Sequence, residues 1–220
     1  MRYQKHINET IGLLRQLSKE LQLACKGKVS TNDITPDRLL WHIFNKIFSI
    51  LVICENGLLM KDSLTIHLIA RYSYEVLIIF AYIFLDKSKI QERVGEFLTF
   101  TQFKSTKQKW TDKTYAKMLE EIPNNTRFST HKRHYRNLSN FAHPNMDSFL
   151  LNCKGEDYEI SMILSTTLLT IGTILEIIKI CFEENLYFDD QRRKMLNLTA
   201  VSSNVSRLMK ELQVVMIEDI

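Results

Sequence analysis

Apolar positions recur at intervals of three and four residues along most of the chain, which is the period of an amphipathic α-helix. The pattern is clearest near the two ends, where it predicts helices over residues 2–26 and 189–213. Gly27 is expected to end the first helix, and Asp189-Asp190 to begin the last. No segment shows a convincing strand pattern. The sequence therefore predicts an all-α protein.

Start and stop signals divide the middle of the chain into further helices. Thr35-Pro36-Asp37 supplies a capping hydroxyl, a proline at the first helical position and an acid in the first turn. Asn56-Gly57 is interpreted as the stop of that helix, after about Glu55. The remaining predicted helices cover residues 63–86, 87–106, 113–121, 129–143 and 157–184. We therefore expect a bundle of about six to eight helices in a single domain over residues 1–220.

Two segments are apolar enough to raise the question of a membrane. The most apolar stretch is 161–175, but its uncharged part is shorter than the ~18 residues expected of a spanning helix. The run 76–85 is shorter still and follows Arg71 and Glu75. A helix that is apolar nearly all round belongs at the centre of a bundle. We interpret both segments as core helices and expect no membrane partner.

Composition adds few constraints. The chain is 45% apolar and 25% charged, as in ordinary soluble proteins, and its net charge of +4 permits a nucleic-acid partner without requiring one. The four cysteines are widely spaced, so neither a zinc site nor a redox dithiol is expected, and no cofactor is implied. The N-terminus is polar and amphipathic, unlike a signal peptide. A reduced, cytoplasmic protein fits best.

Candidate chemistry is concentrated in the stretch from Tyr135 to Pro144. Arg136 and His143 lie on the helix predicted to end before Pro144, because the residue preceding a proline disfavours the α conformation. Seven residues correspond to about 700° of rotation and about 10 Å of rise, so the two side chains return to nearly the same face. With Asn137, this face presents a permanent cation, an amide and a titratable imidazole.

The motif Arg136-Asn137…His143 resembles the signature of the HEPN superfamily, an arginine and a polar residue followed by a histidine after four to six residues. The surrounding residues also resemble a family of bacterial helical proteins in which an earlier helix carries Arg-x-x-x-Glu, matched here by Arg71 and Glu75. The resemblance covers roughly residues 35–185 and implies an HEPN-like core. The helices 2–26 and 189–213 would pack on that core or on a partner.

The resemblance implies a metal-independent endoribonuclease that acts as a homodimer, with paired motifs forming one cleft. Such proteins serve as toxins or as antiphage effectors in abortive infection, so an antitoxin or a regulatory protein would be a further partner. One departure concerns regulation. Some members are silenced by adenylylation of a tyrosine two residues after the histidine, and this chain has Asn145 there. That mode of control is not expected.

The residue types suit RNA cleavage by attack of the 2′-OH on the adjacent phosphorus. His143 would act as general acid or base, because imidazole titrates near neutral pH. Arg136 would clamp phosphate oxygens with its planar fork, and Asn137 would support it. A two-fold axis would supply a second set of the same groups. Tyr135, Arg71 and Glu75 are candidate supporting residues, with Glu75 holding the guanidinium of Arg136 or Arg71.

Cations interleaved with aromatic residues precede the motif, an arrangement that suits contact with RNA backbone and stacked bases. We expect a tRNA or an mRNA as partner. The candidate RNA-binding residues are Arg127, His131, Lys132, Arg133, Lys107, Lys109 and Trp110.

Simpler interpretations remain open. His143 would also be stable as a helix C-terminal histidine favoured by the helix dipole, with Arg136 a surface residue. Arg71 and Glu75 would also serve as an intrahelical ion pair that only fixes packing, and the lysines as a solvated face. The alternative function is a non-catalytic HEPN-like module, such as a sensor, an adaptor or an antitoxin-type binding protein. No nucleophile elbow, phosphate-binding glycine loop or metalloprotease motif competes with these two readings.

Overall fold

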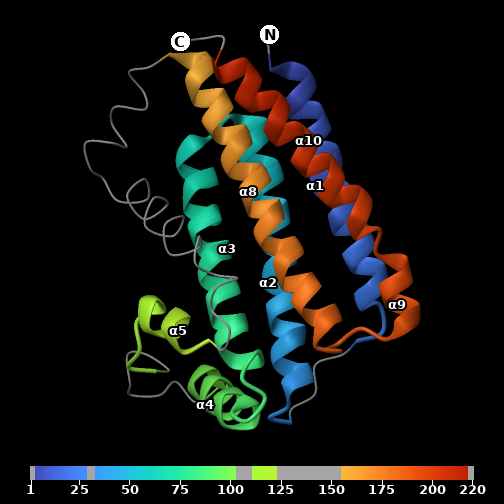
Figure 1. Cartoon of the computed structure of the whole chain (residues 1–220), viewed down its shortest axis with the longest axis vertical. Helices are drawn as coiled ribbons and strands as arrows, with labels where there is room; N and C mark the ends of the chain where they lie inside the picture. The colour runs from blue at the N-terminus through green and yellow to red at the C-terminus, as the bar shows by residue number, and fades with distance from the viewer. Residues whose placement is uncertain (1–2, 29–32, 103–110, 123–154, 218–220) are drawn as a thin grey trace.

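The computed structural model of the protein describes residues 3–28, 33–102, 111–122 and 155–217 (Figure 1). These residues form helices and short connections, with no strand among them. The all-α prediction is therefore confirmed. The helices are α1 (Gln4–Cys25), α2 (Pro36–Met60), α3 (Ser63–Phe84), α4 (Ile90–Gln102), α5 (Tyr115–Glu121), α8 (Glu156–Glu183), α9 (Asp190–Met195) and α10 (Leu198–Ile217).

The centre of the bundle is formed by α3 and α8, which lie side by side (Figure 1). Helix α2 packs against both, and α1 and α10 cover the opposite side of α8 from α3. The short helices α4 and α5 lie at the C-terminal end of α3. The predicted helix over 129–143, which carries the Arg136…His143 motif, lies outside the described residues.

Helix α2 begins as predicted but ends later. The Thr35 hydroxyl accepts a hydrogen bond from the N–H of Arg38 at 3.3 Å, which caps the first turn. The predicted stop at Asn56-Gly57 is wrong, because Gly57 lies buried where α2 packs on α3, and a Cβ there would be 3.0 Å from Cδ1 of Ile66. The glycine therefore permits a close helix–helix approach. Lys61, in a left-handed conformation with φ 54°, ends the helix instead.

The single helix predicted over 189–213 is divided into α9 and α10. Asp189 caps α9 as expected, since its carboxylate accepts from the N–H of Arg192 at 2.9 Å. Leu196 is extended, with φ −95° and ψ 102°, and the Asn197 side chain accepts from the N–H of Ala200 at 3.3 Å. A short amide that bonds the local backbone offers an alternative to helical bonding. The chain breaks there and starts a new helix.

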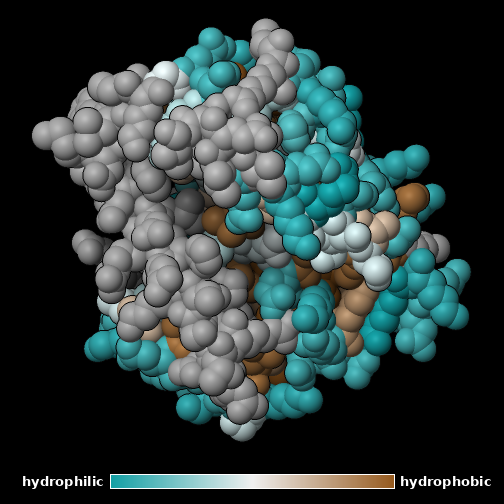
Figure 2. All heavy atoms as spheres, turned by 45° about the horizontal axis from the view of Figure 1, so that its top comes forward, coloured by the Kyte–Doolittle hydropathy of each residue, from teal (hydrophilic) through white to brown (hydrophobic). Residues whose placement is uncertain are grey.

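Three helices are long and apolar enough to cross a membrane, judged by length and composition only: α2, α3 and α8. The sequence argument considered uncharged runs alone and so missed that whole helices meet this criterion. In the bundle, 72% of the most apolar window of α3 and 67% of that of α8 are buried, against 44% for α2. Burial in the bundle explains the apolar composition of α3 and α8. Helix α2, in contrast, leaves Val52, Leu59 and Met60 exposed. Figure 2 shows hydrophobic atoms reaching the surface between polar regions.

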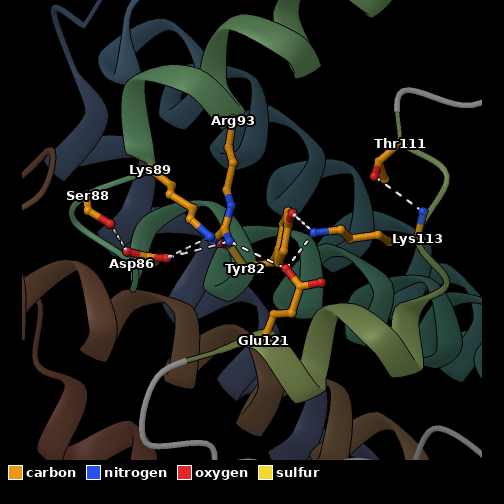
Figure 3. Close-up of polar contacts among 8 residues, drawn as sticks. All are labelled: Tyr82, Asp86, Ser88, Lys89, Arg93, Thr111, Lys113 and Glu121. Atoms are coloured by element: carbon orange, nitrogen blue, oxygen red, sulfur yellow. Dashed lines mark hydrogen bonds and ion pairs between the residues drawn. The ribbon is translucent and has the colours of Figure 1, made fainter.

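A buried arginine, Arg93, connects α4 to the C-terminal end of α3. The Arg93 side chain is only 3% exposed, and its guanidinium carbon lies 3.8 Å from the centroid of the Tyr82 ring (Figure 3). Its Nη1 donates to the backbone oxygen of Tyr82. Its Nη2 lies 3.6 Å from a carboxylate oxygen of Asp86 and 3.7 Å from one of Glu121. A buried cation needs such partners, and here they come from α5 and from the end of α3.

Helix α5 is joined to the same cluster by Lys113. Its Nζ lies 2.5 Å from Oε2 of Glu121 and donates to the Tyr82 hydroxyl at 3.0 Å (Figure 3). These bonds raise the pKa of Lys113 and lower that of Glu121, each mainly through the hydrogen bond between the two side chains. The cluster of Tyr82, Asp86, Arg93, Lys113 and Glu121 thus fixes α4 and α5 relative to α3.

Candidate functional site

Most residues of the predicted site belong to segments outside the structural description. Arg136, Asn137, His143 and Tyr135 lie outside the described residues. So do all the candidate RNA-binding residues: Arg127, His131, Lys132, Arg133, Lys107, Lys109 and Trp110. Of the predicted site, the structure describes the supporting pair Arg71 and Glu75.

Arg71 and Glu75 form an ion pair one turn apart on α3. Nε of Arg71 lies 3.2 Å from Oε1 of Glu75, and the two side chains are 26% and 19% exposed. The Tyr115 hydroxyl, on α5, donates to the other carboxylate oxygen at 3.3 Å. Each oxygen of Glu75 is therefore held by a different helix. The pair does more than fix register within α3, because Glu75 also connects α3 to α5.

Glu75 borders a cavity of about 500 Å³ enclosed by α2, α3, α4 and α5. The cavity is partly open, and most of its described lining is apolar. The apolar lining residues are Leu39, Ile43, Val76, Ile79, Phe97 and Leu98. The Arg93 cluster positions two of its walls, since it fixes α4, which carries Phe97 and Leu98, and α5, which carries Tyr115.

Basic side chains of α2 line the cavity on one side. Arg38, His42 and Lys46 follow one another at intervals of four residues, so they share one helix face. Arg38 is partly buried, and His42 and Lys46 are exposed. Loss of hydration beside the surrounding protein lowers the pKa of His42 first, and the positive charges of Arg38 and Lys46 lower it further. His42 is therefore mainly neutral at pH 7.

The described lining of the cavity carries more positive than negative charge. Among its described lining residues Glu75 is the acidic one, and its charge already faces the guanidinium of Arg71. Tyr72 and Tyr115 contribute hydroxyl groups on the α3 and α5 sides. The arrangement offers an apolar floor, two permanent cations and two phenols.

Neither metal binding nor thiol chemistry is indicated in the part of the chain that the structure describes. No group of three or more His, Cys, Asp or Glu residues is placed there to hold a metal ion. Cys25, Cys54 and Cys181 are free thiols. Burial raises the pKa of Cys54 to about 12 and that of Cys25 to about 11, so both stay protonated and unreactive at neutral pH.

The sequence interpretation missed the cavity and its basic side. The signal was present in the spacing of Arg38, His42 and Lys46, which places three bases on one face of a predicted helix. The contribution of Tyr115 could not be foreseen, because it lies 40 residues from Glu75 in sequence.

No protein-family model matches the chain, and none of the curated proteins or solved structures compared with it matches significantly.

Proposed function

We propose that the protein is a metal-independent endoribonuclease of the HEPN type that cleaves RNA by 2′-OH attack. It would act as a cytoplasmic toxin or antiphage effector. In this proposal His143 moves protons, Arg136 binds the phosphate and Asn137 supports them. A homodimer would bring two such sets to one cleft.

The structural observation that carries the proposal is the Arg71–Glu75 pair on the central helix α3. It matches the companion pattern of the helical proteins that the motif resembles, and the all-helical fold is the one such a motif requires. The carboxylate is held firmly, since Tyr115 donates to its second oxygen. A carboxylate oriented in this way is suited to positioning a neighbouring guanidinium.

The cleavage test compares wild type with His143→Ala on a mixed pool of tRNA and mRNA in the presence of EDTA. The proposal predicts that the wild type cuts RNA without added metal and that His143→Ala does not. His6→Ala removes an imidazole from α1 and serves as the matched control, with activity expected near that of the wild type. A fully active His143→Ala protein would contradict the assignment.

A second candidate function is a non-catalytic sensor that keeps the fold without the chemistry. The cavity between α2 and α5 favours it, because a sensor needs a ligand site. Absence of cleavage by both wild type and His143→Ala, together with ligand binding in the cavity, would select this function.

A further inference from the structure

The cavity has the size and composition of a small-molecule site. Its volume of about 500 Å³ lies within the range of about 300–1,000 Å³ that is usual for ligand pockets. Such pockets combine a mainly apolar lining with a few polar groups that orient the ligand. Here Ile43, Val76 and Phe97 are among the apolar lining residues, and the permanent cations Arg38 and Lys46 stand on one side.

The charged residues of the lining favour a ligand with a negative charge. Arg38 and Lys46 lie two turns apart on α2, so an acidic group between them would meet positive charge from both ends. The guanidinium of Arg38 presents a planar fork suited to carboxylate, sulfonate or phosphate oxygens, and Lys46 presents a mobile point charge. The one acidic group of the described lining, Glu75, is engaged by Arg71 and Tyr115. It therefore offsets little of this potential.

The apolar lining favours a ligand that also carries an apolar or aromatic body. A free inorganic anion would leave most of the apolar lining in contact with water, whereas an apolar or aromatic body would cover it. Removal of apolar surface from water favours the second kind of ligand. Tyr72 and Phe97 offer aromatic rings from α3 and α4 along the same cavity.

We infer that this cavity binds a soluble amphipathic anion, with its acidic head group between Arg38 and Lys46 and its apolar body against Ile43, Val76 and Phe97. The inference does not depend on RNA cleavage, since the cations Arg38 and Lys46 have no part in the proposed ribonuclease chemistry. It assigns the basic face of α2 a role that the proposed ribonuclease leaves unexplained.

The experiment measures binding of two fluorescent probes that differ in one group. The anionic probe is 8-anilinonaphthalene-1-sulfonate, and the neutral one is N-phenyl-1-naphthylamine, which has the same ring system without the sulfonate. Wild type is compared with Arg38→Ala/Lys46→Ala. The matched control is Lys19→Ala/Lys194→Ala, which removes two exposed cations from α1 and α9 and changes the net charge equally.

The expected result is a loss of at least tenfold in sulfonate affinity for Arg38→Ala/Lys46→Ala, with neutral-probe affinity within twofold of wild type. The control variant should bind both probes like the wild type. Ile79→Trp, which adds bulk to the lining, should weaken both probes at least fivefold. Because Lys46 is exposed, Lys46→Ala alone keeps its fold and should weaken sulfonate binding at least threefold.

Equal sulfonate affinity in wild type and Lys46→Ala would overturn the inference, as would an equal loss in the control variant. A vesicle arm separates soluble anions from lipid head groups. Sedimentation of the protein with phosphatidylglycerol vesicles that is lost in Arg38→Ala/Lys46→Ala would assign the cations to a membrane lipid and overturn a soluble ligand. No sedimentation, with sulfonate binding intact, supports it.

Discussion

The hydroxyl of Tyr115 donates to Oε2 of Glu75 at 3.3 Å, across 40 residues of sequence. This bond joins α5 to α3 at the rim of the cavity. It adds a second partner to the carboxylate of the Arg71-x-x-x-Glu75 pattern. Helix α3, which carries the Arg71–Glu75 pair, and helix α5, which lines the cavity, are thus connected through the Glu75 side chain.

Replacing Tyr115 by phenylalanine tests this connection. The change removes one partly buried hydrogen bond to a charged acceptor and keeps the ring. We expect Tyr115→Phe to lower the free energy of unfolding by about 0.5–1.5 kcal/mol, measured by urea denaturation. Tyr72→Phe, at an exposed phenol of the same cavity, should change it less. Equal effects of the two variants would show that the bond to Glu75 contributes nothing specific.

The close approach of α2 and α3 at Gly57 gives a second prediction. A Cβ at Gly57 would lie 3.0 Å from Cδ1 of buried Ile66, so Gly57→Ala should lose about 1–3 kcal/mol through overpacking. Alanine's better helix propensity returns about 1 kcal/mol, and we expect a net loss of stability. Ile66→Val removes Cδ1 and should reduce that loss in the double variant. Chemical denaturation of all four proteins measures the coupling.

Gly12→Ala is the control for this cycle. Gly12 is in the middle of α1 with no atom within 4 Å of a built Cβ. Because alanine favours helix over glycine by about 1 kcal/mol, this change should stabilise the protein. A stabilising Gly57→Ala would contradict the packing argument.

The buried Arg93 gives a third prediction. Arg93→Met removes the cation that Asp86, Glu121 and the Tyr82 carbonyl share, and losing its charged hydrogen bonds should cost about 1.5–3 kcal/mol. The variant should also bind 8-anilinonaphthalene-1-sulfonate more weakly, since α4, which lines the cavity, loses its contact with α3. Lys89→Ala, a half-exposed cation 3.9 Å from Asp86, should cost less than about 1 kcal/mol. Arg93→Met with wild-type stability would refute this account of how α4 is held.

The pH dependence of anion binding gives a fourth prediction. In the free protein the pKa of His42 is lowered, first by loss of hydration and then by Arg38 and Lys46, with Glu75 the acidic group of the described lining. A bound anion favours the protonated imidazole and raises that pKa. Binding should therefore take up a proton, and sulfonate affinity should rise as pH falls from 8 to 6. His42→Gln should abolish this slope. A pH-independent affinity in wild type would contradict it.

Helix content was readable from the sequence because three- and four-residue periodicity and capping residues report local preferences. Thr35 and Asp189 cap where expected. The stop predicted at Gly57 was wrong because this glycine packs against Ile66 of another helix. That contact depends on tertiary structure and cannot be read from local sequence. Asn197 broke the last helix through a local side-chain bond that an apolar period does not register.

In the candidate site, too, local features could be predicted from the sequence and long-range contacts could not. The Arg71–Glu75 pair follows from i, i+4 spacing and is found as an ion pair. The cavity depends on how α2, α3, α4 and α5 assemble, and the Arg93 cluster that fixes them joins residues from separate segments. Such long-range contacts have no signature in a single sequence. The Arg136…His143 motif rests on sequence alone.

The most direct test of the central claim is the chemistry of the cut RNA ends. Attack by the 2′-OH without a metal leaves 2′,3′-cyclic phosphates, and a 2′-deoxy nucleotide at the cleaved position blocks it. We predict that RNA cut by the wild-type protein in EDTA carries cyclic phosphate ends and that the 2′-deoxy substrate stays intact. Cleavage of the 2′-deoxy substrate, or ends with a free 3′-hydroxyl, would contradict the proposed ribonuclease.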